Sequence, residues 1–390
     1  MNINQRYLIN NILNDNYINI LQRNTDKLIR NYGIDLLRIF SMINIINLHI
    51  NLKTGLFSLN PENIKFKNIW RLETFSYFAV DCFGLISGIV GFNKYKFSNL
   101  IYLWFISVFY SVNIHAYLFI RNGINIIHFF LSFFPILNKF HWYVNAYFIM
   151  YLFLPFINFG IKLLNVKTFN LVYFYIFFFS IYFISSALFN KTDYNFLLDG
   201  YSSSWLTILY IIGSYFGKYI LESYNKSNKL VKYFFLINYI GFSFFSSEIY
   251  FITEKRLLIN YLSPTILFQA LSLVIFFYSI KITNNHIIKI IKYITPLVFS
   301  ATLIHSILFS LKIKLILSLF EFIKELNNNF IFLKIYLISV IVFMFCIILD
   351  FFRLLLFKIL KIREICQFIE RIFPKIFDNC LLLINKLLIN

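Results

Sequence analysis

Apolar stretches recur along the whole chain, and short segments that carry charged residues separate them. A run of roughly twenty apolar residues has the length of a helix that crosses a bilayer. The pattern predicts an all-α fold, a polytopic membrane helix bundle with residues 33–350 as its transmembrane domain. We expect ten transmembrane helices, at residues 33–52, 75–92, 97–120, 143–161, 169–189, 203–221, 231–252, 259–280, 293–313 and 331–350.

The segments outside these stretches have patterns of their own. Residues 1–32 place Leu and Ile at helical spacing among polar residues and lack the features of a signal peptide, which predicts an amphipathic segment on the cytoplasmic face. Residues 351–390 combine Lys and Arg with apolar residues in a similar way, so we expect a basic amphipathic tail on the inner leaflet. Gly123 and Pro135 interrupt residues 121–140, which predicts a re-entrant or interfacial piece rather than an eleventh span.

Composition supports the membrane interpretation and reduces the number of possible function classes. The chain is 59% hydrophobic with a mean hydropathy of +0.72, so it has more apolar surface than one soluble core can bury. Its net charge is +19, but the basic residues are scattered and form no continuous basic face, which argues against a nucleic-acid partner. The four cysteines show no close ligand spacing, so we expect neither a disulfide framework nor a metal site.

The distribution of Lys and Arg predicts the orientation of the chain. If the N-terminus lies inside, 22 of the 36 basic residues fall on cytoplasmic segments and 13 on external ones, and Arg38 lies within the first span. Cytoplasmic loops carry an excess of Lys and Arg. We therefore expect both termini to be cytoplasmic and the protein to be a multi-pass protein of a plasma membrane.

The first span contains three ionisable residues, Asp35, Arg38 and His49, which are costly inside a membrane unless they have partners or a function. The 11 positions from Arg38 to His49 correspond to about three helical turns, so both side chains lie on one face, about 16 Å apart along the axis. Asp35 is one turn from Arg38 and can pair with it. An anchoring ion pair and a hydrogen bond between helices are the alternatives to a functional role.

The second span places Asp81 at a depth similar to that of His49. A carboxylate there can accept a hydrogen bond from an imidazole N–H and orient the ring, although capping a helix or pairing with a loop lysine is the alternative. Ser87, Gly88 and Gly91 are small residues with the spacing of a close helix crossing.

These stretches together resemble the acyltransferase type 3 family, whose members transfer acyl groups onto cell-surface sugars and related acceptors. The family places an Arg or Lys before a His in its first span with ten residues between them, which Arg38 and His49 match. The resemblance extends over residues 33 to about 358. Further segments similar to the family's are "IDLLR" (34–38), "VDCFGLISG" (80–88, with Gly84 at an aromatic position), "HWYVNAYFIMYLFLPF" (141–156) and "SATLIHSIL" (300–308).

The resemblance implies a reaction and a set of site residues. Acyl-CoA, with acetyl-CoA as the expected form, donates an acyl group to a hydroxyl of a cell-surface glycan or its lipid-linked precursor in the bacterial inner membrane. His49 acts as general base with Asp81 beside it, and a covalent acyl-histidine is the less favoured variant. The residues expected to bind the acyl-CoA are Arg38, Asp35, Lys94 and Lys96. The residues expected to contact substrate are Trp142, Tyr143, Tyr151, Ser87 and His305.

A transporter or flippase of a lipid-linked glycan is the main alternative, because intramembrane charges also line substrate paths. It predicts two related halves and polar residues on several spans. Here the strongest polar cluster is confined to the first two spans. A glycan polymerase would ordinarily require a large external loop, and the sequence has none. The pattern therefore favours the acyltransferase.

Overall fold

The computed structural model describes residues 30–92, 94–123, 126–136, 141–163, 197–221, 229–311, 314–328 and 330–373. Every regular element in these ranges is a helix, which confirms the all-α bundle. The predicted N-terminal segment, apart from its last three residues, and the predicted span at 169–189 lie outside the described residues.

Seven described helices are long and apolar enough to cross a membrane, so the protein is a multi-pass membrane protein. They are Tyr32–Lys53, Ile64–Gly91, Phe97–Arg121, Trp142–Leu163, Leu230–Thr253, Asn285–Ser310 and Ile331–Ile359. The predicted total of ten is not confirmed. Two of the predicted spans contain shorter helices, α11 (Ser203–Tyr215) and α14 (Pro264–Tyr278).

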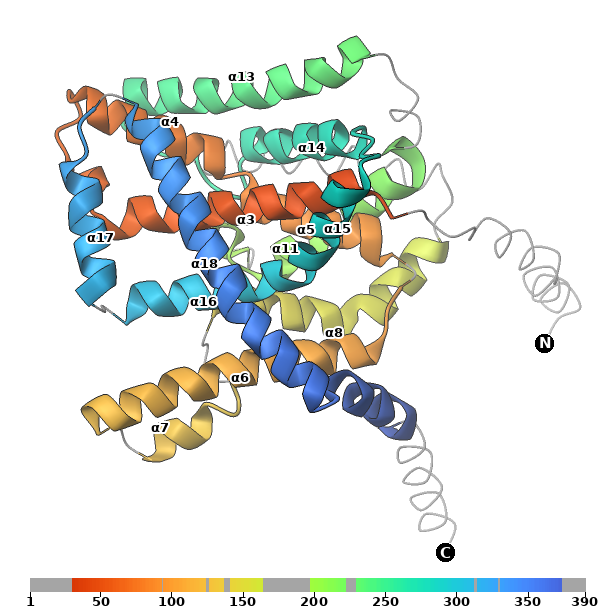
Figure 1. Cartoon of the computed structure of the whole chain (residues 1–390). Coiled ribbons are helices and arrows are strands. Elements are labelled where there is room, and N and C mark those ends of the chain that lie inside the picture. The colour runs from red at the N-terminus through yellow and green to blue at the C-terminus, as the bar shows by residue number, and fades with distance from the viewer. Residues whose placement is uncertain are drawn as a thin grey trace, which may run out of the picture.

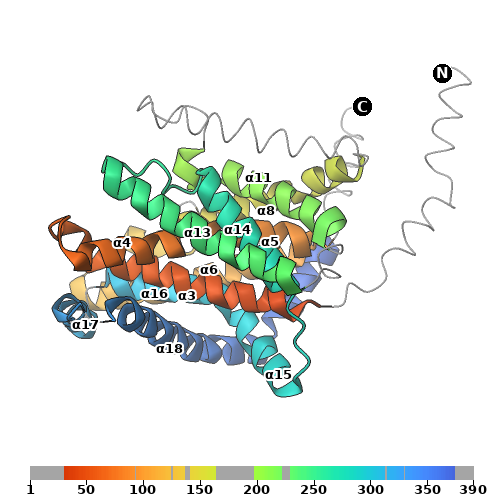
Figure 2. The same ribbon diagram turned by 90° about the horizontal axis from the view of Figure 1, so that it is seen from above.

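Helix α3 (Tyr32–Lys53) lies at the centre of the bundle. Figures 1 and 2 show it between α13 (Lys229–Thr253) with α14 on one side and α18 (Ile331–Ile359) on the other. It also packs against the remaining central helices. These are α4 (Ile64–Ser76), α5 (Ala79–Gly91), α15 (Asn285–Ile294) and α16 (Val298–Ser310). The helix is enclosed because it has polar side chains on several faces, which lipid would not solvate.

Side chains of α4 form hydrogen bonds with the asparagines of α3. Asn47 donates to Ser76 Oγ at 2.8 Å, and Ser76 in turn donates to Asn44 Oδ1 at 3.0 Å. Asn51 donates to Glu73 Oε2 at 2.9 Å. Because buried polar groups are costly without partners, these bonds fix the rotation of α3 about its axis and hence the direction of His49.

Helices α5 and α11 cross very closely, as the small residues of the second span predict. A Cβ atom at Gly88 would collide with the backbone carbonyl of Tyr210, and one at Gly213 would collide with the α5 backbone. A Cβ at Gly84 would lie 2.7 Å from Cβ of Leu209. An aromatic side chain at position 84 would not fit, which explains why the sequence departs from the family pattern there.

The bundle is completed by α6 (Phe97–Asn122), α8 (Trp142–Leu163) and two short helices, α7 (Ile126–Leu131) and α17 (Lys314–Glu325). At six residues α7 is too short to span a bilayer, in keeping with the prediction for residues 121–140. Helix 362–373 follows α18 and packs on the start of α6. Figure 1 shows helix 362–373 at the same end of the bundle as the start of α3.

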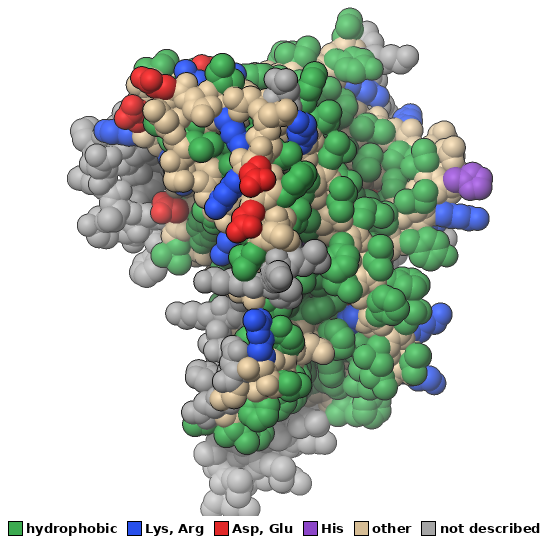
Figure 3. Space-filling view, turned by 60° about the vertical axis from the view of Figure 1, so that its left-hand side comes forward, with side chains coloured by type: hydrophobic (Ala, Val, Ile, Leu, Met, Phe, Trp, Pro, Cys, Tyr) green, Lys and Arg blue, Asp and Glu red, His purple; other side chains and the backbone are tan. Residues whose placement is uncertain are grey.

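Hydrophobic side chains cover much of the surface. Figure 3 shows them dominating the right-hand part of one face, while the acidic side chains gather to the upper left and centre of that view. Exposed apolar side chains on α18 include Ile341, Phe345 and Ile348, and α13 exposes Phe234 and Ile237 in the same way. Such surfaces are stable in contact with lipid, which agrees with a helix bundle embedded in a bilayer.

Candidate active site

A cavity of about 320 Å³ opens beside His49. Its walls come from α3, α4, α5, α8 and α16 and from the loops that carry Tyr201, Arg256 and Tyr261. The ionisable side chains that line it, tyrosines apart, are His49, Glu73, His141 and Arg256. The aromatic side chains that line it are Phe57, Tyr77, Trp142, Tyr143, Tyr201 and Tyr261. An aromatic pocket with a few polar groups is the usual form of a small-molecule site.

His49 is paired with His305 of α16. Nδ1 of His49 lies 2.6 Å from Nε2 of His305, and Nδ1 of His305 lies 2.7 Å from the carbonyl oxygen of Ala301. A carbonyl only accepts, so the hydrogen of His305 is on Nδ1. His305 is completely buried and no acidic side chain contacts it among the described residues, so we assign it as neutral.

This assignment fixes the tautomer of His49. A neutral imidazole has one N–H group, so Nε2 of His305 is an acceptor and Nδ1 of His49 donates to it. Nε2 of His49 then carries a lone pair and is the ring nitrogen available to the cavity. The arrangement gives His49 the form of a general base, with His305 holding the ring in place.

A third histidine completes this part of the cavity. His141 Nε2 lies 3.1 Å from Ser306 Oγ, whose hydroxyl donates to the carbonyl of Thr302 at 2.8 Å. His141 therefore donates through Nε2, and its Nδ1 is buried without a hydrogen-bond partner among the described residues.

Asp81 does not occupy the position expected for it. Trp205 Nε1 donates to Asp81 Oδ1 at 3.0 Å, which joins α5 to α11, while Oδ2 of Asp81 is buried without a partner in the described part of the chain. The described residues contain no hydrogen bond between Asp81 and His49. His305 of α16 instead makes the contact with His49 that was expected of Asp81, whose carboxylate is bonded to Trp205 of α11.

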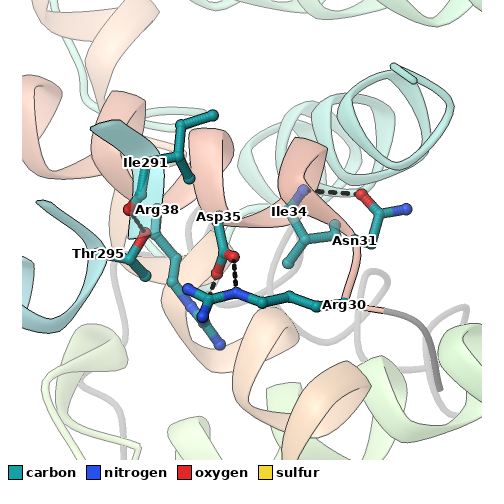
Figure 4. Close-up of polar contacts among 7 residues, drawn as sticks. All are labelled: Arg30, Asn31, Ile34, Asp35, Arg38, Ile291 and Thr295. Atoms are coloured by element: carbon teal, nitrogen blue, oxygen red, sulfur yellow. Dashed lines mark hydrogen bonds and ion pairs between the residues drawn. The ribbon is translucent and has the colours of Figure 1, made fainter. Parts of the chain in front are cut away.

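The opposite end of α3 carries the predicted ion pair. Arg38 Nη1 lies 2.9 Å from Asp35 Oδ1, and Arg30 Nε lies 2.5 Å from Asp35 Oδ2 (Figure 4). The Asp35 carboxylate is buried between the two guanidinium groups, and the Arg38 side chain is 25% exposed. One carboxylate thus faces two positive charges, which leaves N–H groups of Arg38 available for another anion.

The remaining predicted site residues divide into two groups. Trp142 and Tyr143 line the cavity as expected. Tyr151 does not: it lies two turns along α8, and its hydroxyl donates to the carbonyl of Lys96 at 3.2 Å. Lys94 and Lys96 are exposed in the short connection between α5 and α6. Tyr151 therefore belongs with the predicted donor-binding lysines rather than with the cavity.

A row of aromatic rings on α8 connects these two groups. Tyr143, Tyr147 and Tyr151 follow one another with ring centroids 6.0 and 6.1 Å apart. Tyr147 lies near Ser87, whose hydroxyl donates to the carbonyl of Phe83, and close enough to Arg38 for an electrostatic interaction. Ser87 thus lies beside this row of rings rather than in the lining of the cavity.

Several cavity residues could not be identified from the sequence, among them Glu73, Arg256, Tyr201 and Tyr261. Glu73 directly precedes the predicted second span and is buried because α4 turns inward along α3. An acidic residue next to an apolar stretch was the one signal available for it.

Comparison with known proteins agrees with this geometry. A family model described as an acyltransferase domain matches residues 31–349, which extend from the start of α3 into α18 and include His49 and His305. Searches of curated proteins and of solved structures gave no match. The family match covers most of the chain, and it decides between the enzyme and the transporter considered above. The chain belongs to the acyltransferase type 3 family and is a membrane acyltransferase.

Proposed function

We propose that the protein transfers an acetyl group from acetyl-CoA to a hydroxyl of a cell-surface glycan or its lipid-linked precursor in the bacterial inner membrane. The observation that carries this proposal is the His49–His305 pair, which presents an unprotonated ring nitrogen at a cavity lined by aromatic side chains.

The chemical step needs only the base and the two substrates. Nε2 of His49 takes the proton of the acceptor hydroxyl as its oxygen forms a bond to the thioester carbonyl carbon. The carbon–sulfur bond then breaks, and the proton on His49 passes to the CoA thiolate. The products are the acyl ester and free CoA. His305 accepts from Nδ1 of His49 throughout and keeps the ring oriented.

The donor is proposed to enter from the Arg38 end of α3. Arg38, Lys94 and Lys96 can meet the phosphates of CoA, and Asp35 holds the guanidinium of Arg38 in place. The flexible arm of CoA then extends along the roughly 16 Å between Arg38 and His49. The small cavity favours a short acyl group, because it must hold both the acyl carbons and part of the acceptor.

The acceptor is proposed to lie in the cavity itself. Trp142 and Tyr201 form an edge-to-face pair with centroids 4.7 Å apart, and Trp142 and Tyr143 form another at 5.5 Å. Aromatic faces pack well on the C–H faces of sugar rings, while tyrosine hydroxyls bond to sugar oxygens. These contacts would place one hydroxyl of the sugar near His49.

The test is turnover of acetyl-CoA by the purified protein in nanodiscs, followed as release of free CoA with glycan acceptors. We expect His49→Ala to lower the turnover number about 10³-fold, within the range for removal of a general base. Arg38→Ala should mainly raise the KM for acetyl-CoA. His286→Ala is the matched control, because His286 is exposed on α15 and does not line the cavity. Normal turnover by His49→Ala would refute the mechanism.

A further inference from the structure

The rim of the cavity carries a guanidinium group that forms no ion pair with the described acidic residues. Arg256 lies over the indole ring of Trp70, with its Cζ 4.8 Å from the ring centroid, and its side chain is exposed. Within the described residues no ion pair includes Arg256. The neighbouring Arg71 differs, because it pairs with Glu248 at 2.9 Å. The positive charge of Arg256 is therefore available to a ligand in the cavity.

Glu73 provides a second polar group at the same cavity. Its Oε2 accepts from Asn51 Nδ2 at 2.9 Å, and the side chain is largely buried. Glu73 is close enough to Arg256 for an electrostatic interaction, but no hydrogen bond joins the two side chains among the described residues. The cavity therefore offers separate positions for a negative group and for a hydroxyl donor of one ligand.

The walls near Arg256 suit a sugar ring. Tyr261 packs against Tyr201 at 5.1 Å and against Tyr77 at 5.0 Å between ring centroids. Burial raises the pKa of Tyr201 above its usual value, so its hydroxyl stays protonated and able to donate. The cavity of about 320 Å³ is at the small end for ligand sites, which favours one sugar residue over an oligosaccharide.

The position of Arg256 along the bundle separates it from the donor end. It follows the C-terminal end of α13 and shares the cavity with Leu52, near the end of α3, whereas Arg38 is close to the beginning of α3. A CoA molecule whose phosphates lie at Arg38 would not also reach Arg256 with them. An anion at Arg256 must then belong to the acceptor.

We propose that the acceptor is a sugar residue with a negatively charged group, which Arg256 binds while Glu73 accepts a hydrogen bond from one of the sugar's hydroxyls. The inference rests on the proposed function, since it places the acceptor in the cavity of His49. A uronic acid residue of a polysaccharide and the sugar phosphate of a lipid-linked precursor share this chemistry, and Arg binds both carboxylate and phosphate through paired N–H groups.

The experiment compares equilibrium binding of matched sugars to the full-length protein in phosphatidylcholine nanodiscs, measured by calorimetry without acetyl-CoA. The probes are the methyl glycosides of glucose, galactose and mannose, the corresponding methyl uronides, and the three hexose 1-phosphates. We expect at least one anionic probe to bind about tenfold more tightly than its neutral counterpart, as a charge-assisted hydrogen bond gives. Preference for the uronide indicates a polysaccharide residue, and preference for the phosphate indicates a lipid-linked precursor.

The variants identify the group responsible for the preference. Arg256→Gln should remove the difference between anionic and neutral probes, Arg256→Lys should keep part of it, and Lys255→Gln should keep all of it, because Lys255 does not line the cavity. Reaction of a maleimide dye with the buried cysteines Cys82, Cys346 and Cys366 during heating confirms that each variant is folded.

Equal binding of every matched pair, binding of no probe, or an unchanged preference in Arg256→Gln would overturn the inference. Binding needs no base, so His49→Ala should retain the preference. If the preference is present but transfer is absent, the proposed function fails and the anionic site remains.

Discussion

Asp350 and Arg353 on α18 form a buried polar cluster in which every charged group is satisfied, whereas the histidine cluster around the cavity retains unused hydrogen-bonding capacity. Arg353 donates to both oxygens of Asp350, at 2.8 Å from Nε and 2.6 Å from Nη2. Tyr110 of α6 donates to the same carboxylate at 2.5 Å. Arg353 also reaches Tyr102 of α6 at 3.2 Å and Ser300 of α16 at 3.4 Å. The cluster links three helices and does not line the cavity.

The histidine cluster is arranged in the opposite way. His305 and Ser306 have their hydrogens committed to backbone carbonyls, but Nε2 of His49 and Nδ1 of His141 retain lone pairs beside the cavity. An unused buried lone pair lowers stability, so its presence is informative when it adjoins a cavity. The difference fits a structural role for the Asp350 cluster and supports the proposal that the histidine cluster carries out the acyl transfer.

The largest effect is expected from Arg353→Ala. Removal of one partner leaves the Asp350 charge buried and uncompensated, which destabilises a protein by about 3–5 kcal/mol. We expect a large drop in the unfolding temperature, measured with the maleimide dye, and an unchanged turnover number per folded molecule at low temperature.

A second variant distinguishes the ion pair from the packing. Replacing both residues, as in Asp350→Leu with Arg353→Met, removes the uncompensated charge and should recover most of the lost stability. If the Arg353→Ala protein is folded but has lost its turnover, the Asp350 cluster contributes to activity as well as to stability, and the separation of the two clusters is wrong.

The next effect concerns His305, which we regard as a positioning residue. His305→Ala removes the acceptor for Nδ1 of His49, so the ring can rotate and adopt the other tautomer. We expect the turnover number to fall about 100-fold, with little change in the KM for acetyl-CoA and a smaller loss of stability than in Arg353→Ala.

Partial rescue separates positioning from packing at this site. His305→Gln retains an acceptor oxygen near the place of Nε2 and should recover part of the turnover number, whereas His305→Leu fills the volume without an acceptor and should not. Equal activity of the Gln and Leu variants would show that His305 only fills space.

Features that depend on a single helix were predicted well from the sequence. The bounds of α3, the common face of Arg38 and His49 and the pair between Asp35 and Arg38 all follow from helical periodicity. The approximate positions of seven spans follow from hydropathy alone.

Features that depend on contacts between distant segments could not be predicted. His305 is 256 positions from His49, and Trp205 is 124 positions from Asp81, so no local pattern shows that they meet. Hydropathy also overestimated the length of α14. The apolar stretch begins at residue 259, whereas the helix begins at Pro264, which occupies its first turn. Arg353 was assigned to the basic tail, since its burial depends on α6 and α16.

A smaller effect is expected at the helix crossing that supports the cavity. Gly88→Ala introduces a methyl group against the backbone of α11, which should destabilise the protein by about 1–3 kcal/mol through forced separation of the helices. Gly91→Ala is the matched control, because its Cβ would lie 3.5 Å from Tyr210, an ordinary contact. Equal unfolding temperatures for the two variants would contradict the close crossing.

The smallest effect is expected from Ser300→Ala, which tests whether the two clusters communicate. Ser300 accepts a long hydrogen bond of 3.4 Å from Arg353 and lies on α16, the helix that also carries His305. Loss of one such bond should cost about 0.5–1 kcal/mol of stability. Because the hydrogen bonds of His305 to Ala301 and His49 do not involve Ser300, the turnover number should stay within twofold of that of the control Ser310→Ala, whose serine is exposed at the end of α16. A tenfold fall in turnover for Ser300→Ala alone would mean that Arg353 sets the position of His305 through α16, and that the structural and chemical clusters act as one unit.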